Sequence, residues 1–171
     1  MPSVRITVNA TPVLQRLQTF SQRLGALRPL LEDVKGRLLV SVQQNFTASG
    51  RPRPWTPLAA STMVNRRGTS ARILRDTGRL QNSISGRIEA TSVIIGTNVV
   101  YGRIHQDGGT IRVPELRPRR AQALRFVIGA QVIFARRVKA HSVRIPARPY
   151  LLLQDRDRTY ITTAIGRHLW I

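Results

Sequence analysis

The residues that could carry out acid–base or metal chemistry are few and scattered in this sequence. The three histidines, at positions 105, 141 and 168, lie far apart along the chain, and only eight residues are acidic. His105 and Asp107 are two positions apart and have the right types to share a metal ion or a base function. They precede a pair of glycines, where a hydrogen bond that stabilises a turn is the commoner role for such side chains. We therefore expect no catalytic site, no metal site and no cofactor.

The motifs that usually mark enzymes are also missing. The sequence has no Walker loop, no GxGxxG or HExxH pattern and no nucleophile elbow. It contains no cysteine, which excludes a disulfide scaffold, a thiolate zinc site and a cysteine nucleophile, and which fits a reducing cytoplasm. No run of about 18 apolar residues predicts a membrane-spanning helix, and the N-terminus does not resemble a secretion signal. We expect the chain to stay on the cytosolic side until something carries it elsewhere.

Positive charge is the strongest chemical signal in the chain. There are 28 basic and 8 acidic residues, for a formal net charge of +20, and every basic residue except Lys35 and Lys139 is an arginine. Because arginine makes bidentate contacts with phosphate and carboxylate groups, such a chain contacts nucleic acid or strongly acidic proteins. A GC-rich genome could explain arginine in place of lysine, but not the shortage of acids.

The charge is densest at residues 112–148, where Glu115 is the single acid. Residues 123–129 and 131–138 have the composition of two strands, which predicts a basic β-hairpin. We expect Phe126 and Phe134 to pack inward in this hairpin rather than to stack on bases. The residues expected to contact DNA or an acidic partner are Arg117, Arg119, Arg120, Arg136, Arg137 and Lys139.

The elements that must position these residues begin with a long helix. The length of 171 residues fits one domain over residues 1–171, with an extended loop at 47–75 and a basic arm at 110–148. Residues 3–9 alternate and predict a short strand, whereas apolar residues spaced by three and four from Leu17 to Leu38 predict a helix. Pro29 interrupts this stripe, so we expect a kink or two abutting helices near residues 25–29. The stripe could pack on the chain's own sheet, which is the commoner use, or on a neighbouring subunit.

Shorter elements follow. Three prolines exclude regular structure at residues 47–61, where Trp55 is expected to anchor the loop on the core. Residues 76–84 suggest a cap and a short helix, 86–90 and 93–97 a hairpin, and 101–109 a loop that closes with a glycine turn. Residues 145–150 are extended and 151–171 form an amphipathic helix.

The expected fold is therefore α+β. The long kinked N-terminal helix and the C-terminal helix pack on a small, mostly antiparallel sheet made from 3–9, 86–90, 93–97 and parts of 123–150. The basic hairpin projects from this sheet.

An ordered series of short motifs carries a family resemblance. After Ser49-Gly50 and Trp55-Thr56-Pro57-Leu58 come LRDTGRL at 74–80, IGTN at 95–98, YGRIHQDGG at 101–109 and IPARPYL at 145–151. Together they resemble the phage virion morphogenesis family, the tail-completion and head–tail joining proteins of long-tailed bacteriophages and Mu-like prophages. Asp107 departs from the apolar or aromatic residue expected there. The resemblance gives structural roles to Trp55, Asp76, Thr77, Gly78, Arg79, Tyr101, His105, Gln106, Gly109, Pro146, Arg148 and Pro149.

The resemblance implies a structural protein of the virion neck, with no enzymatic activity and no cofactor. It implies a homo-oligomeric ring that is assembled in the bacterial cytoplasm and meets neck, portal-side and tail proteins, without a membrane. Packaged double-stranded DNA in the lumen would be a further partner, contacted without reading of its sequence. The ring could be a tail terminator, a stopper next to the portal or a collar, with six or twelve copies.

Two other functions fit parts of the sequence. A free, non-specific nucleic-acid-binding protein would bind DNA with an affinity that falls steeply with salt. A small enzyme that uses His105 and Asp107 would lose activity on His105→Ala while it stays folded. The structural function predicts instead that His105→Ala mainly lowers stability.

Overall fold

The computed structural model describes residues 10–64, 66, 72–119, 121–128 and 131–170. Its helices are α1 (Thr11–Gly25), α2 (Arg28–Thr47), α3 (Ala60–Val64), α4 (Arg79–Asn82), α5 (Gly102–Asp107) and α6 (Asp155–Trp170). Its strands are β1 (Ser85–Glu89), β2 (Ser92–Gly96), β3 (Gly109–Val113), β4 (Leu124–Ile128), β5 (Gln131–Ala135) and β6 (His141–Ile145). Helices and small antiparallel sheets occur together, which confirms the predicted α+β class.

The N-terminal helix is broken into α1 and α2 within the predicted range of residues 25–29. Pro29 lies in the first turn of α2, where its missing N–H removes no helical hydrogen bond. The apolar stripe behaves differently on the two helices. α2 buries Val34, Val42 and Phe46, whereas α1 has no buried residue and Leu17 is 58% exposed. The part of the stripe on α1 therefore does not pack in the chain's own core, contrary to the expectation.

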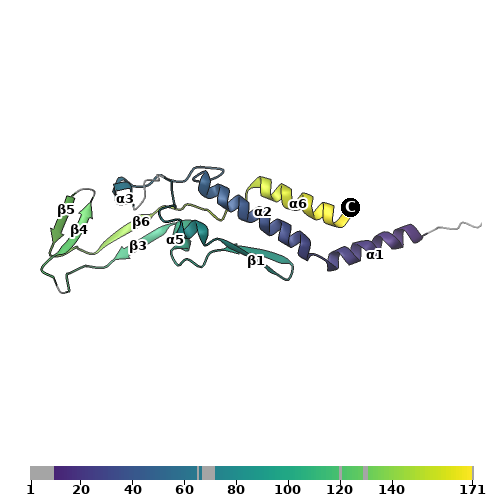
Figure 1. The fold of residues 1–171 in the computed structure, drawn as a ribbon, viewed down its shortest axis with the longest axis horizontal. Helices are drawn as coiled ribbons and strands as arrows, with labels where there is room; N and C mark the ends of the chain where they lie inside the picture. The colour runs from purple at the N-terminus through teal and green to yellow at the C-terminus, as the bar shows by residue number, and fades with distance from the viewer. Residues whose placement is uncertain (1–9, 65, 67–71, 120, 129–130, 171) are drawn as a thin grey trace, which may run out of the picture.

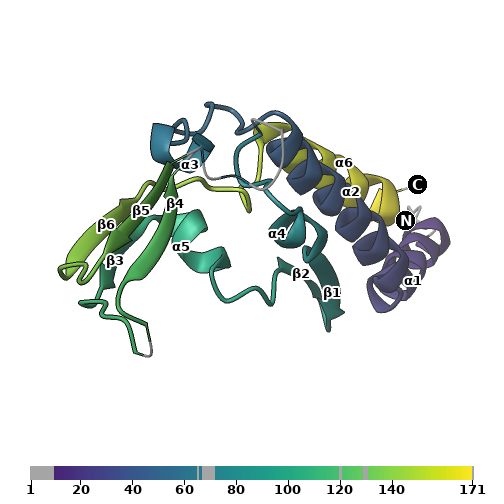
Figure 2. The ribbon, with the colours of Figure 1, turned by 60° about the vertical axis from the view of Figure 1, so that its left-hand side comes forward.

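The strands form three separate pairs rather than the single sheet expected from the sequence. β1 pairs with β2, β3 with β6 and β4 with β5, and each pair is antiparallel. α5 and the segment after β2 lie between the β1–β2 hairpin and the β3–β6 pair, so these strands are not neighbours (Figure 2). Residues 3–9, expected as a further strand, lie outside the described residues.

Strands β3 to β6 build an extended arm. The Leu116–Val138 bridge, with N···O distances of 3.0 and 2.9 Å, continues the β3–β6 pair toward β4 and β5. This arm occupies one end of an elongated molecule and α1 the other (Figure 1). Phe134 is 67% exposed, so the expectation that it packs inward is wrong, whereas Phe126 is half-buried. The reason is that the face of β4–β5 that carries Phe134 has no cover from the described residues.

The aromatic core lies between the two ends of the molecule. The ring of Phe46 on α2 packs against Trp55 and Tyr150, with centroid distances of 5.8 and 5.3 Å. Leu80 on α4 and Val99 complete the buried cluster around them. Large rings dominate the apolar contribution of a small core. This packing fixes the motif segments, which are distant in sequence, relative to one another.

Several local expectations need correction. Residues 102–107 form the helix α5 instead of a loop. The range 47–61, expected to have no regular structure, includes the last residue of α2 and the first two residues of α3. The N-cap position of α4 is Gly78, which has no side chain to cap the helix, whereas the hydroxyl of Thr77 accepts from the N–H of Arg79. The C-terminal helix begins at Asp155 rather than at 151, because the carboxylate of Asp157 accepts a hydrogen bond from the N–H of Gln154 over 3.1 Å and so caps the helix there.

Candidate functional site

Residues 101–109 and 145–151 are joined by hydrogen bonds into one unit, which we call the motif clasp. The N–H of Arg148 donates to the carbonyl of His105 over 2.8 Å. The side-chain oxygen of Gln106 accepts from the N–H groups of Tyr150 and Leu151, each over 3.0 Å. Because prolines keep residues 145–150 extended, these N–H groups need partners outside their own segment. The side-chain oxygen of Gln106 is the acceptor for both N–H groups, as the carbonyls of a neighbouring strand would be.

Arg148 connects the clasp to the proline-rich loop. Its side chain is buried, and its Nε and Nη2 atoms donate to the carbonyls of Thr56 and Pro57 over 3.0 and 3.1 Å. Burial lowers the pKa of Arg148 from its ordinary value. A buried charge needs such polar partners, and the two carbonyls provide them. Beside it, the indole N–H of Trp55 donates to the carbonyl of Pro149 over 3.2 Å. The loop and the clasp are therefore one structural unit.

The arm leaves the clasp through a tight turn. Gly108 has a φ of +73°, and a Cβ at this position would lie 2.7 Å from the backbone nitrogen of Ala147, so only glycine fits. Gly109 begins β3 and pairs with Ile145, the last residue of β6. Pro146 follows directly. The clasp thus fixes both strands at the base of the arm.

His105 and Asp107 do not form a shared site. His105 is half-buried and its ring lies edge-on to Tyr101, with centroids 5.8 Å apart, whereas Asp107 is exposed and faces Arg103 over 3.7 Å. Residues two apart on a helix such as α5 point in different directions. Within the described part of the chain, no group of three or more His, Cys, Asp or Glu side chains could hold a metal ion.

His105 makes stability depend on pH. Burial, and secondly the charge of Arg148, lower the pKa of His105 from its ordinary value. The unfolded chain then binds a proton more readily than the folded chain, so the stability that His105 contributes is present above about pH 6.5 and is lost as the pH falls through the folded-state pKa. We expect the free energy of unfolding to fall between pH 7 and pH 5 more steeply for the native chain than for His105→Gln. Denaturant titrations at several pH values measure this difference, and equal slopes would contradict it.

A buried polar cluster that the sequence did not reveal surrounds Asn45 on α2. The amide of Asn45 is fully buried and donates to the carbonyl of Tyr150 over 2.9 Å. Its oxygen accepts from Nε of Arg51 over 2.9 Å and from the side chain of Gln154 over 3.4 Å. The carbonyl of Arg51 accepts a further bond from Gln154, over 3.0 Å. Asn45 therefore holds the clasp, the loop and the start of α6 together.

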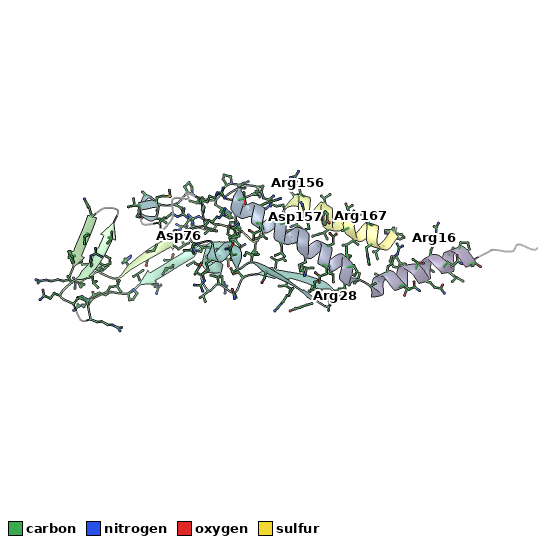
Figure 3. The ribbon with its side chains drawn as sticks, in the orientation of Figure 1. Arg16, Arg28, Asp76, Arg156, Asp157 and Arg167 are labelled. Atoms are coloured by element: carbon green, nitrogen blue, oxygen red, sulfur yellow. The ribbon has the colours of Figure 1, made fainter. Side chains whose placement is uncertain are left out.

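Asp157 makes the second connection between α6 and α2. Its carboxylate, 1% exposed, accepts from the hydroxyl of Ser41 over 2.5 Å and lies 3.3 Å from Nε of Arg37. Figure 3 shows Asp157 at the start of α6, where this helix runs beside α2. Asp155 and Asp157 are the sequence signal at this point, since acidic residues favour the first turn of a helix, but they do not indicate a buried ion pair.

The motif around Asp76 lines a large cavity together with the clasp. Asp76 lies 3.7 Å from Nε of Arg66, and the hydroxyl of Thr77 accepts from the N–H of Arg79 over 3.5 Å. The cavity has a volume of about 1130 Å³ and extends between α3, the residues before α4, α5 and the end of β6. Its lining includes the motif residues Asp76, Thr77, Gly78, Arg79, Tyr101, His105, Pro146 and Arg148.

The basic residues expected to contact DNA or an acidic partner lie on the arm. Five of them are exposed: Arg117, Arg119, Arg136, Arg137 and Lys139. Arg120 lies outside the described residues. Arg117 and Arg137 share Glu115 as an ion-pair partner, with N···O distances of 2.5 and 4.0 Å, so part of their charge is already compensated.

The chain is similar to proteins of phage assembly. The phage virion morphogenesis family matches residues 8–170. The protein named Mu-like prophage FluMu G protein 2 from Haemophilus influenzae is 29% identical over 153 residues, which cover 90% of this chain and 86% of that protein. No solved structure matches the chain. None of the described helices is long and apolar enough to cross a membrane.

Proposed function

This chain belongs to the phage virion morphogenesis family, and on that premise we propose that it is a structural subunit of the virion neck that completes the tail and joins it to the head. Several copies form a ring around the path of the DNA, and the ring contacts neck, portal-side and tail proteins. The chain acts by holding surfaces together rather than by catalysis. Residues 1–171 act as one domain, with the arm as its outward extension.

The observation that carries this proposal is the apolar surface that the described residues leave uncovered at both ends of the molecule. On α1, Val13, Leu14 and Leu17 are 58–59% exposed, and on the arm Phe134 is 67% exposed beside Val132 at 46%. Monomeric proteins rarely leave such large apolar groups together in water. Two different surfaces at opposite ends are what a heterologous contact between copies requires, and such contacts close into rings when the rotation permits.

The exposed cations of the arm support the second part of the proposal. Arg119, Arg136 and Lys139 are exposed on the same arm as Arg117 and Arg137. We propose that this set, with Arg120, contacts the packaged DNA or an acidic surface of a neighbouring virion protein. Phosphate contacts of this kind hold DNA without reading its sequence.

The same basic arm favours one alternative function, a non-specific nucleic-acid-binding protein that acts alone. Disruption of the gene distinguishes the two functions. A protein acting alone on DNA would leave head–tail joining intact when its gene is disrupted, and its affinity for duplex DNA would fall steeply with salt.

Electron microscopy of lysates from the parent phage with this gene disrupted tests the proposed function. We expect filled heads and finished tails that lie separate, because the proposed joint between them is missing. Joined, normal particles would contradict the proposal and favour the DNA-binding alternative.

Complementation with variant genes adds the control. The native gene should restore joined particles, whereas Arg119→Glu combined with Arg136→Glu should not. The matched variant Arg156→Glu combined with Arg158→Glu changes the net charge equally on α6, away from the arm and from the apolar surface of α1, and should restore joined particles (Figure 3 labels Arg156). If the arm variant restores joining as well as the native gene, these arginines have no role in it.

A further inference from the structure

The cavity at the motif clasp is the feature that the proposed ring does not explain. It has a volume of about 1130 Å³ and is lined by residues of the proline-rich loop, α3, α4, α5 and β6. A space of that size is enough for several side chains of a bound segment. Four stretches that are distant in sequence, near Pro57, Asp76, His105 and Ile145, form its walls.

The walls carry strong positive charge. Five arginines line the cavity: Arg66, Arg75, Arg79, Arg144 and Arg148. The single acidic residue in the described lining is Asp76, whose carboxylate lies 3.7 Å from Nε of Arg66. The side chain of Arg66 is 6% exposed, and its Nη1 atom is buried without a hydrogen-bond partner among the described residues. In the same part of the chain, the Nδ1 atom of His105 is also buried without a hydrogen-bond partner. Buried polar groups are normally hydrogen-bonded, so a bound ligand would supply the partners that these two nitrogen atoms lack.

The remaining walls are apolar. Leu58, Leu74, Val143 and Ile145 line the cavity between the arginines. Free phosphate or a nucleotide would satisfy the cations but would leave these side chains uncovered. A peptide with carboxylates and apolar side chains in alternation satisfies both, because arginine binds carboxylates in a bidentate manner while the apolar groups pack on the leucines and valine.

We propose that this cavity is a docking site for an acidic, partly apolar segment of another virion protein. The inference rests on the proposed function, because it supplies the ring with a specific neighbour. A second copy of this chain is a poor source, since its acids are few and the adjacent pair Glu32-Asp33 lies within α2. Duplex DNA presents its phosphates on the outside of a wide rod, which suits the projecting arm better than a cavity.

Fluorescence anisotropy with the purified full-length chain tests the proposal. The probe is a labelled ten-residue peptide in which glutamate alternates with leucine or valine. The variant Arg79→Glu/Arg144→Glu reverses two exposed cations at the cavity, and we expect it to weaken peptide binding about tenfold or more. The matched control is Arg16→Glu/Arg156→Glu, which has the same net charge and should bind the peptide nearly as the native chain does. Binding of a labelled DNA duplex should be similar for the two variants, because both keep Arg117, Arg119, Arg120, Arg136, Arg137 and Lys139, the cations proposed to contact DNA.

Three results would overturn the inference. The first is that the native chain does not bind the peptide. The second is that both double variants lose affinity for the peptide equally, which would mean that the peptide is attracted to any basic protein. Alternatively, the cavity variant loses DNA binding rather than peptide binding, which makes the cavity a nucleic-acid surface. Arg79→Gln/Arg144→Gln, checked by thermal unfolding, repeats the test without introducing repulsion.

The phage assay separates this inference from the proposed function. If gene disruption leaves particles joined, the proposed function fails whatever the peptide does. If disruption separates heads from tails but the cavity variant restores joining fully, the ring function stands and the docking site is wrong.

Discussion

Replacing Gly50 by alanine is expected to lower the free energy of unfolding by about 4 kcal/mol. Gly50 has a φ of +113°, and a Cβ there would lie 2.6 Å from both the carbonyl oxygen of Arg53 and the nitrogen of Trp55. Both are backbone atoms, so the clash cannot be relieved by rotating a side chain. The loop would have to move, and Trp55 would lose its place against Phe46.

The chain offers a matched control for this substitution. Gly36 lies inside α2, and a Cβ there would meet no atom within 4 Å. Because alanine is the better helix former, Gly36→Ala should raise the free energy of unfolding by roughly 0.5–1 kcal/mol. Thermal unfolding compares the two, and the melting temperature of Gly50→Ala should fall by roughly 10 °C. A melting temperature for Gly50→Ala within a degree or two of the native chain would refute the expected clash.

Asn45→Ala should lower the free energy of unfolding by about 3 kcal/mol. The substitution leaves the carbonyl of Tyr150 and Nε of Arg51 without their partner at a fully buried position, and it removes one of the acceptors of the Gln154 amide. Leaving buried polar groups unpaired costs more than the lost hydrogen bonds alone would suggest. The clasp should therefore loosen from α2, which is measurable as faster amide hydrogen exchange at Tyr150 and Leu151.

Gln44→Ala is the control for Asn45. Gln44 is the neighbouring residue, is exposed, and accepts one bond from Arg51 over 2.8 Å. Its loss should cost less than about 1 kcal/mol because water can replace it. Asn45→Asp should fall between the two, since it keeps the acceptor for Arg51 and loses the donor to Tyr150. Denaturant unfolding that ranks Gln44→Ala as the most damaging change would show that the cluster is not organised around Asn45.

Both substitutions act on the base of the arm rather than on the arm itself. Gly50 and Asn45 fix the proline-rich loop and the clasp, and β3 and β6 start and end directly at the clasp. A change in this region should therefore alter where the exposed cations of the arm lie, without removing any of them. In a ring, that displacement would be repeated in every copy.

The sequence determined the features that depend on neighbouring residues. The α+β class, the break between α1 and α2, the β1–β2 hairpin and the short helix α4 follow from proline positions, from apolar spacing and from local turns. The ordered motifs also determined the family, because their identity and order are properties of the sequence itself. The same local signals explain the errors at 101–107, where two glycines indicated a turn but gave no sign of the helix before it.

The tertiary structure alone decided which of these elements meet. Strand partners are chosen across long stretches of chain, so nothing local distinguishes one sheet from three pairs. Phe134 carries the pattern of a buried residue, yet it is exposed because no described element covers its face of the arm. Asn45 and Asp157 resemble ordinary polar positions of a helix until folding surrounds them with Tyr150, Arg51 and Arg37. Burial of a polar group becomes favourable only when its partners arrive from elsewhere in the chain, and that is a property of the fold and not of any single segment.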